Sequence, residues 1–145
     1  MSLTWAISLM PCLSKDFEVR VGPLVQICIA NPGTLPSISP HQFPTVWALI
    51  DTGAEQTSIA PSVAAAAEIQ PIGMQPMRSA THVVNTNVYL VDLLIRLESF
   101  VRYPGVQVSE FPQPPKGSSF EAILGRDVLC KGSFFMANGI YTLCL

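Results

Sequence analysis

Short apolar stretches separated by turn-forming residues recur along the whole chain. Large apolar side chains alternate with small or polar ones from Thr4 to Met10, which is typical of a strand with one buried face. Apolar runs at Thr45–Ile50 and Ala122–Leu124 predict buried strands, and a longer strand is predicted at Val88–Leu97. Thirteen prolines and nine glycines punctuate these runs. The pattern favours an all-β fold of short strands, either a barrel or a sandwich.

The rest of the chain adds further strands, two short helices and three irregular stretches. Additional strands are expected at Phe17–Ala30 (with a kink or turn at Gly22–Pro23), Thr57–Ala60, Val106–Phe111, Ser133–Met136 and Ile140–Leu145. The last two are predicted to form a hairpin, because Asn-Gly at 138–139 is a strong hairpin signal. Helices are predicted at Pro61–Glu68, where a proline precedes an alanine run, and at Arg126–Lys131. The stretches 31–44, 69–84 and 111–119 are expected to be loops or irregular extended chain.

The composition limits the size and the class of the protein. A length of 145 residues is that of one domain, 1–145, although Met1–Ser2–Leu3 can be interpreted as an expression remnant. The chain is 49% hydrophobic and 12% charged, against about 25% charged in an average protein. Two interpretations remain open: apolar surface buried against a partner, or a plain compact core with few surface charges.

The charge pattern excludes several classes of partner. The net charge is −2, and the chain has no run of lysine and arginine, which argues against nucleic acid. No apolar stretch is long enough to span a bilayer, so no membrane association is predicted. The apolar stretch near the N-terminus has no basic residue before it and makes a poor signal peptide. The default prediction for the location is the cytoplasm.

Four cysteines are scattered along the chain without a Cys-x-x-Cys pair: Cys12, Cys28, Cys130 and Cys144. With only two histidines in addition, a zinc site is not expected. The favoured interpretation is reduced and mostly buried thiols. An even count would also permit two disulfides in an exported protein.

The most informative segment is Ala48–Ala54, in which an apolar strand delivers the carboxylate of Asp51 onto a turn that also carries a hydroxyl and a glycine. An acid directly after a buried strand costs free energy unless it is hydrogen-bonded or has a chemical role. A second apolar strand, Ala122–Leu124, turns at Gly125 into a predicted helix. Because aspartate and glycine are also favoured in ordinary turns, the first segment alone leaves a purely structural turn open.

Together the two segments, 48–54 and 122–129, resemble the signature segments of the retropepsin-like aspartic proteases. The resemblance covers about residues 45–145, and it implies a closed β-barrel-like acid-protease fold. Members of that family build one active site from two copies of the Asp-Thr-Gly turn. This chain has one copy, so the resemblance implies a homodimer.

The same resemblance assigns Asp51, Thr52 and Gly53 to catalysis. Two Asp51 side chains would meet across a twofold axis and share one proton, because like charges about 3 Å apart cannot both ionise. The ionised carboxylate would take a proton from a bound water, which attacks the peptide carbonyl, while the protonated one donates to the developing oxyanion and then to the leaving nitrogen. Thr52 would send its hydroxyl across the interface, and Gly53 would let the backbone approach the substrate. The mechanism needs no metal or other cofactor.

Four further residues are implied to have structural roles: Glu55, Gly125, Arg126 and Asp127. Glu55 would pair with Arg126 and tie the catalytic turn to the helix that follows Gly125. The alternative for Glu55 is a solvated loop residue. Asp127 is interpreted as a cap or local hydrogen-bond partner, and not as a second catalytic acid.

Retropepsins close over their substrate with a glycine-rich hairpin, the flap. By its order in the chain, the flap tip corresponds to residues 79–82, and Tyr89 is expected to pack beneath it. Glycine is absent from this tip, so the flap is expected to be stiffer, differently shaped or closed by other means. The residues expected to contact substrate are Gly53, Ala54, Glu55, Ser79, Ala80, Thr81 and His82.

The sequence therefore favours an aspartic endopeptidase that cleaves an extended peptide bound as an added strand. One alternative is a dimerisation or peptide-binding module with the protease fold and no turnover, which the glycine-poor flap would favour. Another is a small β-barrel that binds a small ligand. In viral members of the family the chain ends interleave in an intermolecular sheet, for which Thr4–Met10 and Ile140–Leu145 are the candidate strands here.

Overall fold

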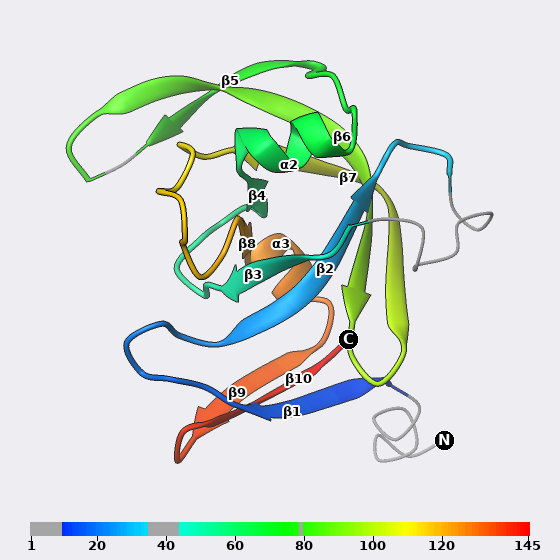
Figure 1. Cartoon of the computed structure of the whole chain (residues 1–145), viewed down its shortest axis with the longest axis vertical. Helices are drawn as coiled ribbons and strands as arrows, with labels where there is room; N and C mark the ends of the chain where they lie inside the picture. The colour runs from blue at the N-terminus through cyan, green and yellow to red at the C-terminus, as the bar shows by residue number, and fades with distance from the viewer. Residues whose placement is uncertain (1–9, 35–43, 79) are drawn as a thin grey trace.

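The computed structural model describes residues 10–34, 44–78 and 80–145. Six of the described strands lie in the order β2-β3-β8-β4-β7-β6, and the pairing of β2 with β6 closes them into a barrel (Figure 1). Their bounds are β2 Leu24–Ala30, β3 Val46–Ile50, β4 Ser58–Ile59, β6 Val83–Arg96, β7 Phe100–Glu110 and β8 Ala122–Leu124. The all-β, barrel-like prediction is confirmed.

The barrel interior is filled by apolar side chains of the strands. Val25, Ile27, Leu93, Leu124 and Val108 are all fully buried. Strand β3 pairs with β8 in parallel, with Ala48 opposite Ala122 and Ile50 opposite Leu124. This parallel pair joins the two signature segments, 70 or so residues apart in the chain, side by side at the centre of the fold.

Strand β7 begins earlier than its sequence suggested. The strand was expected to begin at Val106, yet β7 begins at Phe100 and runs through Pro104 and Gly105. A register shift between Val91 and Leu93 accommodates the irregularity, and the buried carboxylate of Asp92 accepts a hydrogen bond from Gly105 N at 2.9 Å. The extra residue lies in β7, where Pro104 and Gly105 stand opposite the single residue Asp92 of β6, and Asp92 supplies the acceptor for the N–H of this bulge.

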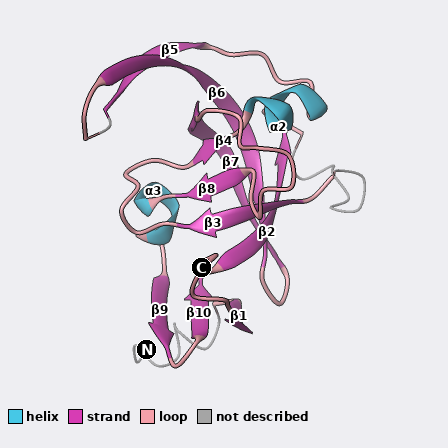
Figure 2. Ribbon diagram, turned by 60° about the vertical axis from the view of Figure 1, so that its left-hand side comes forward, coloured by secondary structure: helices cyan, strands magenta, loops and turns pink. Residues whose placement is uncertain are grey.

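A hairpin projects from the barrel as an arm, formed by β5 (Gly73–Arg78) and the first half of β6 (Figures 1 and 2). The prediction of irregular chain over 69–84 is wrong for this part. Its sequence signal is weak because Pro76 lies in the strand and both faces of β5 stay half-buried or exposed, so no alternation marks it. The tertiary pairing with β6 makes it a strand.

A second sheet has the order β1-β10-β9, built from β1 (Cys12–Asp16), β9 (Ser133–Ala137) and β10 (Ile140–Cys144). The β9–β10 hairpin agrees with the Asn-Gly prediction, and Asn138 and Gly139 both have positive φ. Strand β10 is paired on both sides within its own chain. It therefore has no free edge for a partner, and the interleaved role expected of 140–145 is wrong. Of the other candidate strand, 4–10, residues 4–9 lie outside the described residues.

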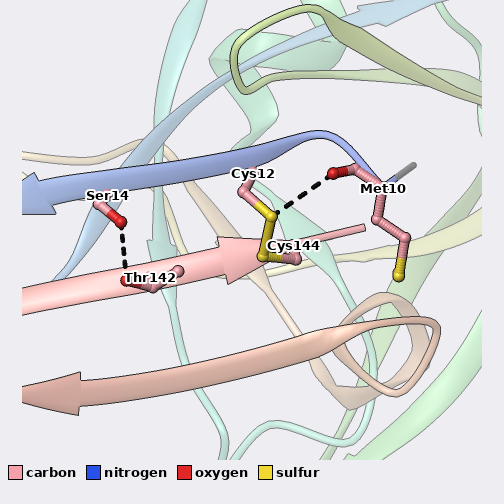
Figure 3. The surroundings of a disulfide bond; sticks show 5 residues. All are labelled: Met10, Cys12, Ser14, Thr142 and Cys144. Carbon is pink, nitrogen blue, oxygen red and sulfur yellow. Dashed lines mark hydrogen bonds between the residues drawn. A yellow bond between two sulfur atoms is a disulfide. The ribbon is translucent and has the colours of Figure 1, made fainter. Parts of the chain in front are cut away.

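Cys12 and Cys144 form a disulfide across the β1–β10 pair, next to a hydrogen bond between the hydroxyls of Ser14 and Thr142 (Figure 3). The expectation of reduced thiols is wrong for these two cysteines, because the register of β1 on β10 places them directly opposite each other. Cys28, which is buried, and Cys130, which is exposed, do not take part in this disulfide.

Two helices carry the chain between strands (Figure 2). Helix α2 (Pro61–Ala66) begins at the predicted proline, and α3 (Arg126–Leu129) follows Gly125 as predicted. None of the helices in the described part of the chain has the length and apolar character needed to cross a bilayer.

Candidate active site

Asp51 lies where β3 leaves the barrel. Its backbone N–H donates to the carbonyl of Leu124 at 3.0 Å, so the parallel neighbour strand fixes its position. One carboxylate oxygen, Oδ1, accepts a hydrogen bond from Gly53 N at 2.9 Å, and Ala54 N closes the turn on the Asp51 carbonyl at 3.2 Å. Asp51 is half-buried, while Thr52 and Gly53 are exposed. The turn thus presents an oriented carboxylate at the molecular surface.

Helix α3 is fastened to this turn by three hydrogen bonds. Arg126 N donates to the carbonyl of Ala54 at 2.9 Å, and Asp127 N donates to that of Glu55 at 3.2 Å. The guanidinium of Arg126 donates from Nη1 to the carbonyl of Thr52 at 2.9 Å. In the described part of the chain no ion pair joins Glu55 to Arg126, so the expected pairing is replaced by a bond to the backbone of the turn. Arg126 therefore does connect the turn to the helix, but the acceptor is the backbone carbonyl of Thr52 and not the carboxylate of Glu55.

Thr57 joins the segment after the turn to Gly125 and Asp127, a role that was not predicted from the sequence. It is fully buried, and its hydroxyl accepts from Gly125 N at 3.1 Å while donating to Asp127 Oδ1 at 2.8 Å. Its own N–H also donates to the Asp127 carboxylate, at 3.0 Å. The carboxylate of Asp127 therefore acts as a local hydrogen-bond acceptor that holds the segment after the turn.

Gly125 packs against this segment too closely for any side chain. A Cβ at this position would lie 2.6 Å from the carbonyl carbon of Gln56 and 2.9 Å from Thr57 N, both backbone atoms. We expect Gly125→Ala to lower the free energy of unfolding by about 1–3 kcal/mol, because the backbone must move to admit the methyl group. Urea denaturation measures the loss.

The matched control for this substitution is Gly73→Ala, since nothing lies within 4 Å of a Cβ at Gly73. Equal unfolding midpoints for the two variants would contradict the close packing of Gly125 on the catalytic segment.

A cavity of about 1190 Å³ opens beside the turn, between the barrel and the hairpin arm. The segment Gly53–Gln56 contributes one side, the β5 residues Gln75–Arg78 a second, and Tyr103–Gln107 of β7 a third. Lys131 at the end of α3 lies over the ring of Tyr103, 5.6 Å from its centroid. Gly53 and Ala54 line this cavity, so it opens directly beside the turn that carries the half-buried Asp51.

The predicted flap tip coincides with the turn between β5 and β6. Ala80, Thr81 and His82 are exposed there, with Thr81 Oγ1 and His82 Nδ1 2.8 Å apart, and Ser79 lies outside the described residues. The hairpin's contribution to the cavity from β5 ends at Arg78, so the described residues of the tip do not line it.

Tyr89 lies deeper in the arm's supporting strand, β6, and it is buried. Its hydroxyl donates to the carboxylate of Glu110 on β7. Burial, together with this bond to Glu110, raises the pKa of Tyr89 to about 12. Tyr89 therefore remains a protonated donor that joins the two strands throughout the neutral and acidic range.

The functional groups around the turn and the cavity are carboxylates, hydroxyls, amides and the cationic side chains of Arg78, Arg126 and Lys131. In the described part of the chain, no three His, Cys, Asp or Glu side chains gather where they could hold a metal ion.

Comparison with known proteins gives two independent likenesses. A family model described as aspartyl protease matches residues 42–128, which is more than half of the chain. The fold is similar to the crystal structure of a retropepsin-like aspartic protease from Rickettsia conorii, with a TM-score of 0.63 and 8% sequence identity, over 93% of this chain and 91% of that one. No curated protein matches the sequence. The likeness of structure shows the fold, and the family match spans both the Asp51 turn and the Gly125–Asp127 segment: the chain belongs to the aspartyl protease family.

Proposed function

We propose that the protein is a homodimeric aspartic endopeptidase in which Asp51 of each subunit supplies one half of the catalytic dyad. The observation that carries the proposal is the Asp51–Gly53 turn itself. It presents a half-buried carboxylate that is already held by Gly53 N, and Gly53 and Ala54 of the same turn line a large cavity. The membership of the aspartyl protease family supports the same chemistry.

A second copy of the chain is required because this copy offers Asp51 no acidic partner. Glu55 and Asp127 are the acids among the described residues that line the cavity. The carboxylate of Asp127 is held by Thr57, and no hydrogen bond joins Glu55 to Asp51 in the described part of the chain. Two carboxylates that share one proton are the minimum for this reaction, so the missing acid comes from a twin.

In the proposed reaction the ionised member of the dyad takes a proton from water as that water attacks the peptide carbonyl. The protonated member donates its proton to the developing oxyanion and afterwards to the leaving nitrogen. Gly53 N and the bond from Arg126 to Thr52 keep the carboxylate and its turn in one orientation, which lowers the cost of reaching the transition state. Thr52 is exposed on the turn, and in this proposal its hydroxyl crosses to the twin.

The substrate in this proposal is an extended peptide or protein segment that lies in the cavity as an added strand. Gly53, Ala54 and Glu55 line the cavity and are proposed to contact it, and residues 79–82 would approach it only when the arm moves. Met77, Val106 and Phe111 give the cavity apolar walls, so apolar side chains are expected in the substrate.

The surface for the twin is proposed on the side to which the catalytic turn, the hairpin tip and the β9–β10 turn all point, on the left of Figure 1. Strand β9 is an edge of its sheet, and Phe135 and Met136 on it are 59% and 52% exposed. An apolar edge strand is unfavourable in a monomer and is covered on dimerisation.

We expect the specific activity to depend on concentration, because only the dimer contains a complete dyad. Sedimentation velocity over a hundredfold range of protein concentration gives the dimer fraction, and cleavage of a peptide library between pH 4 and 7 gives the activity. The two curves should superimpose. A protein that stays monomeric at its highest concentration contradicts the proposal, and a dimer that binds library peptides without cleaving them is the non-catalytic module.

The cytoplasmic location predicted from the sequence carries a chemical requirement. Cytosolic thiols are kept reduced, so Cys12 and Cys144 would have to be free thiols in the cell. Alkylation of the native protein before and after reduction, followed by mass spectrometry, decides between the two states.

A further inference from the structure

The hairpin arm is poorly anchored by packing. Of the residues on β5, none is buried; Gln75 and Met77 are half-buried, and the others are exposed. Because side chains alternate along a strand, Gln75 and Met77 share one face, and both line the cavity. Met74 on the opposite face is 65% exposed. Apart from its pairing with β6, the arm therefore depends on what its inner face touches.

Gln75 makes the polar contact on that face. Its Nε2 donates to Oε1 of Gln56 at 2.6 Å, and Gln56 Nε2 in turn donates to the carbonyl of Gln107 on β7 at 3.1 Å. All three residues line the cavity. The two amides thus form a bridge across it, from the arm to the segment that follows the catalytic turn and on to the barrel wall.

We propose that the hydrogen bond between the Gln56 and Gln75 side-chain amides is a latch that holds the arm closed. When a peptide binds, both amides exchange this bond for hydrogen bonds to the main chain of the peptide, a step called the hand-over below. Gln56 is five residues beyond Asp51, so the latch lies within one short peptide length of the catalytic carboxylate. When an extended peptide enters between arm and floor, a peptide N–H replaces the donor that Gln56 Oε1 loses, and a peptide carbonyl replaces the acceptor that Gln75 Nε2 loses. Hydrogen bonds are exchanged without a net loss.

The latch gives a physical reason why the arm needs no glycine at its tip. A glycine-rich tip closes by adapting its backbone to the substrate. Here the closed state is fixed by a side-chain bond on the strand itself, so the tip residues Ala80–His82 need not deform. Because both partners are neutral amides, the latch does not change with pH, unlike an ion pair at the same place.

The first test measures arm opening in the ligand-free protein by amide hydrogen exchange. Gln56→Ala and Gln75→Ala are each expected to speed exchange of the β5 amides by about fivefold, the effect of losing one hydrogen bond. The double variant should be no faster than either single one, since the same bond is lost. Gln26→Ala, which removes the acceptor of a bond from Arg96 on the barrel, is the matched control and should leave β5 exchange unchanged.

A pair of charged substitutions tests whether the contact between positions 56 and 75 is what keeps the arm closed. Gln56→Glu combined with Gln75→Lys places opposite charges at the two positions and should restore slow exchange at pH 7. Protection should then fall below about pH 4 as the carboxylate is protonated, whereas protection in the wild type stays constant. Additive effects of the two alanine variants, or a charged pair that fails to restore protection, overturn the latch.

The hand-over to a peptide rests on the proposed function and has its own readout. With a cleaved library peptide, Gln75→Ala should raise KM by about fivefold and leave kcat and the pH profile unchanged, because the amide binds the main chain and not the reacting atoms. A fall in kcat at constant KM overturns the hand-over. If no peptide is cleaved at all, the proposed protease function fails, while the exchange experiment still decides the latch.

Discussion

Asp51→Asn is expected to lower kcat/KM for peptide cleavage by about 10³-fold or more, while the protein stays folded and dimeric. The amide cannot take the proton from water and cannot share a proton with its twin, so the reaction loses its general base and acid together. The fold is kept because an asparagine Oδ1 can still accept the hydrogen bond from Gly53 N. Initial rates on a cleaved library peptide measure the loss, and thermal unfolding checks the fold. Unchanged cleavage would reject Asp51 as the catalytic residue.

A mixing experiment makes the same substitution a test of the shared site. When wild-type and Asp51→Asn subunits pair at random, wild-type dimers are about one quarter of all dimers in an equal mixture. If each hybrid lacks one acid, the activity should follow the square of the wild-type fraction. Activity proportional to the wild-type fraction itself would mean that one Asp51 per dimer suffices for cleavage. The proposed dyad of two Asp51 side chains would then be rejected.

Replacing both Cys12 and Cys144 with serine is expected to lower the free energy of unfolding by about 4–5 kcal/mol. The disulfide closes a loop between residues 132 positions apart, which removes a large conformational entropy from the unfolded chain. The serine variant keeps the remaining β1–β10 pairing, including the Ser14–Thr142 hydrogen bond, so the native sheet can still form. Urea denaturation of oxidised wild type and variant gives the difference.

Cys130→Ser is the control for the disulfide, because Cys130 is exposed and has a free thiol. It should leave the unfolding curve in place. The reduced wild type should unfold at the same urea concentration as the double serine variant. The oxidised wild type should unfold at a clearly higher urea concentration than both. Coincidence of all four curves would show that the two cysteines contribute nothing through a covalent bond.

Several parts of the site could be predicted because local patterns specify them. The apolar strand before Asp51, the turn with its glycine, and the short strand before Gly125 each carry their signal within a few residues. The Asn138–Gly139 turn was identified for the same reason, since only residues that tolerate positive φ suit it. An element whose geometry depends on adjacent residues can therefore be predicted from a single sequence.

Other parts depend on partners that are remote in the chain. The family resemblance implied that Arg126 pairs with Glu55, yet its guanidinium donates to the carbonyl of Thr52. A backbone acceptor cannot be identified from the sequence, because every residue carries one. Thr57 showed no signal for its role, since its two partners become neighbours only when β4 lies beside β8. The same holds for Gln56 and Gln75, which are joined across a cavity that no local pattern describes.

The sequence alone was enough to predict the all-β class and the Asp51–Thr52–Gly53 turn at the end of a buried strand. These follow from the spacing of apolar residues and from the chemistry of three consecutive side chains. The tertiary structure alone decided the central place of β10, the Cys12–Cys144 bond and the latch on the arm. Each of these depends on strand register, which is fixed when the whole barrel and its second sheet pack together and not by any segment taken alone.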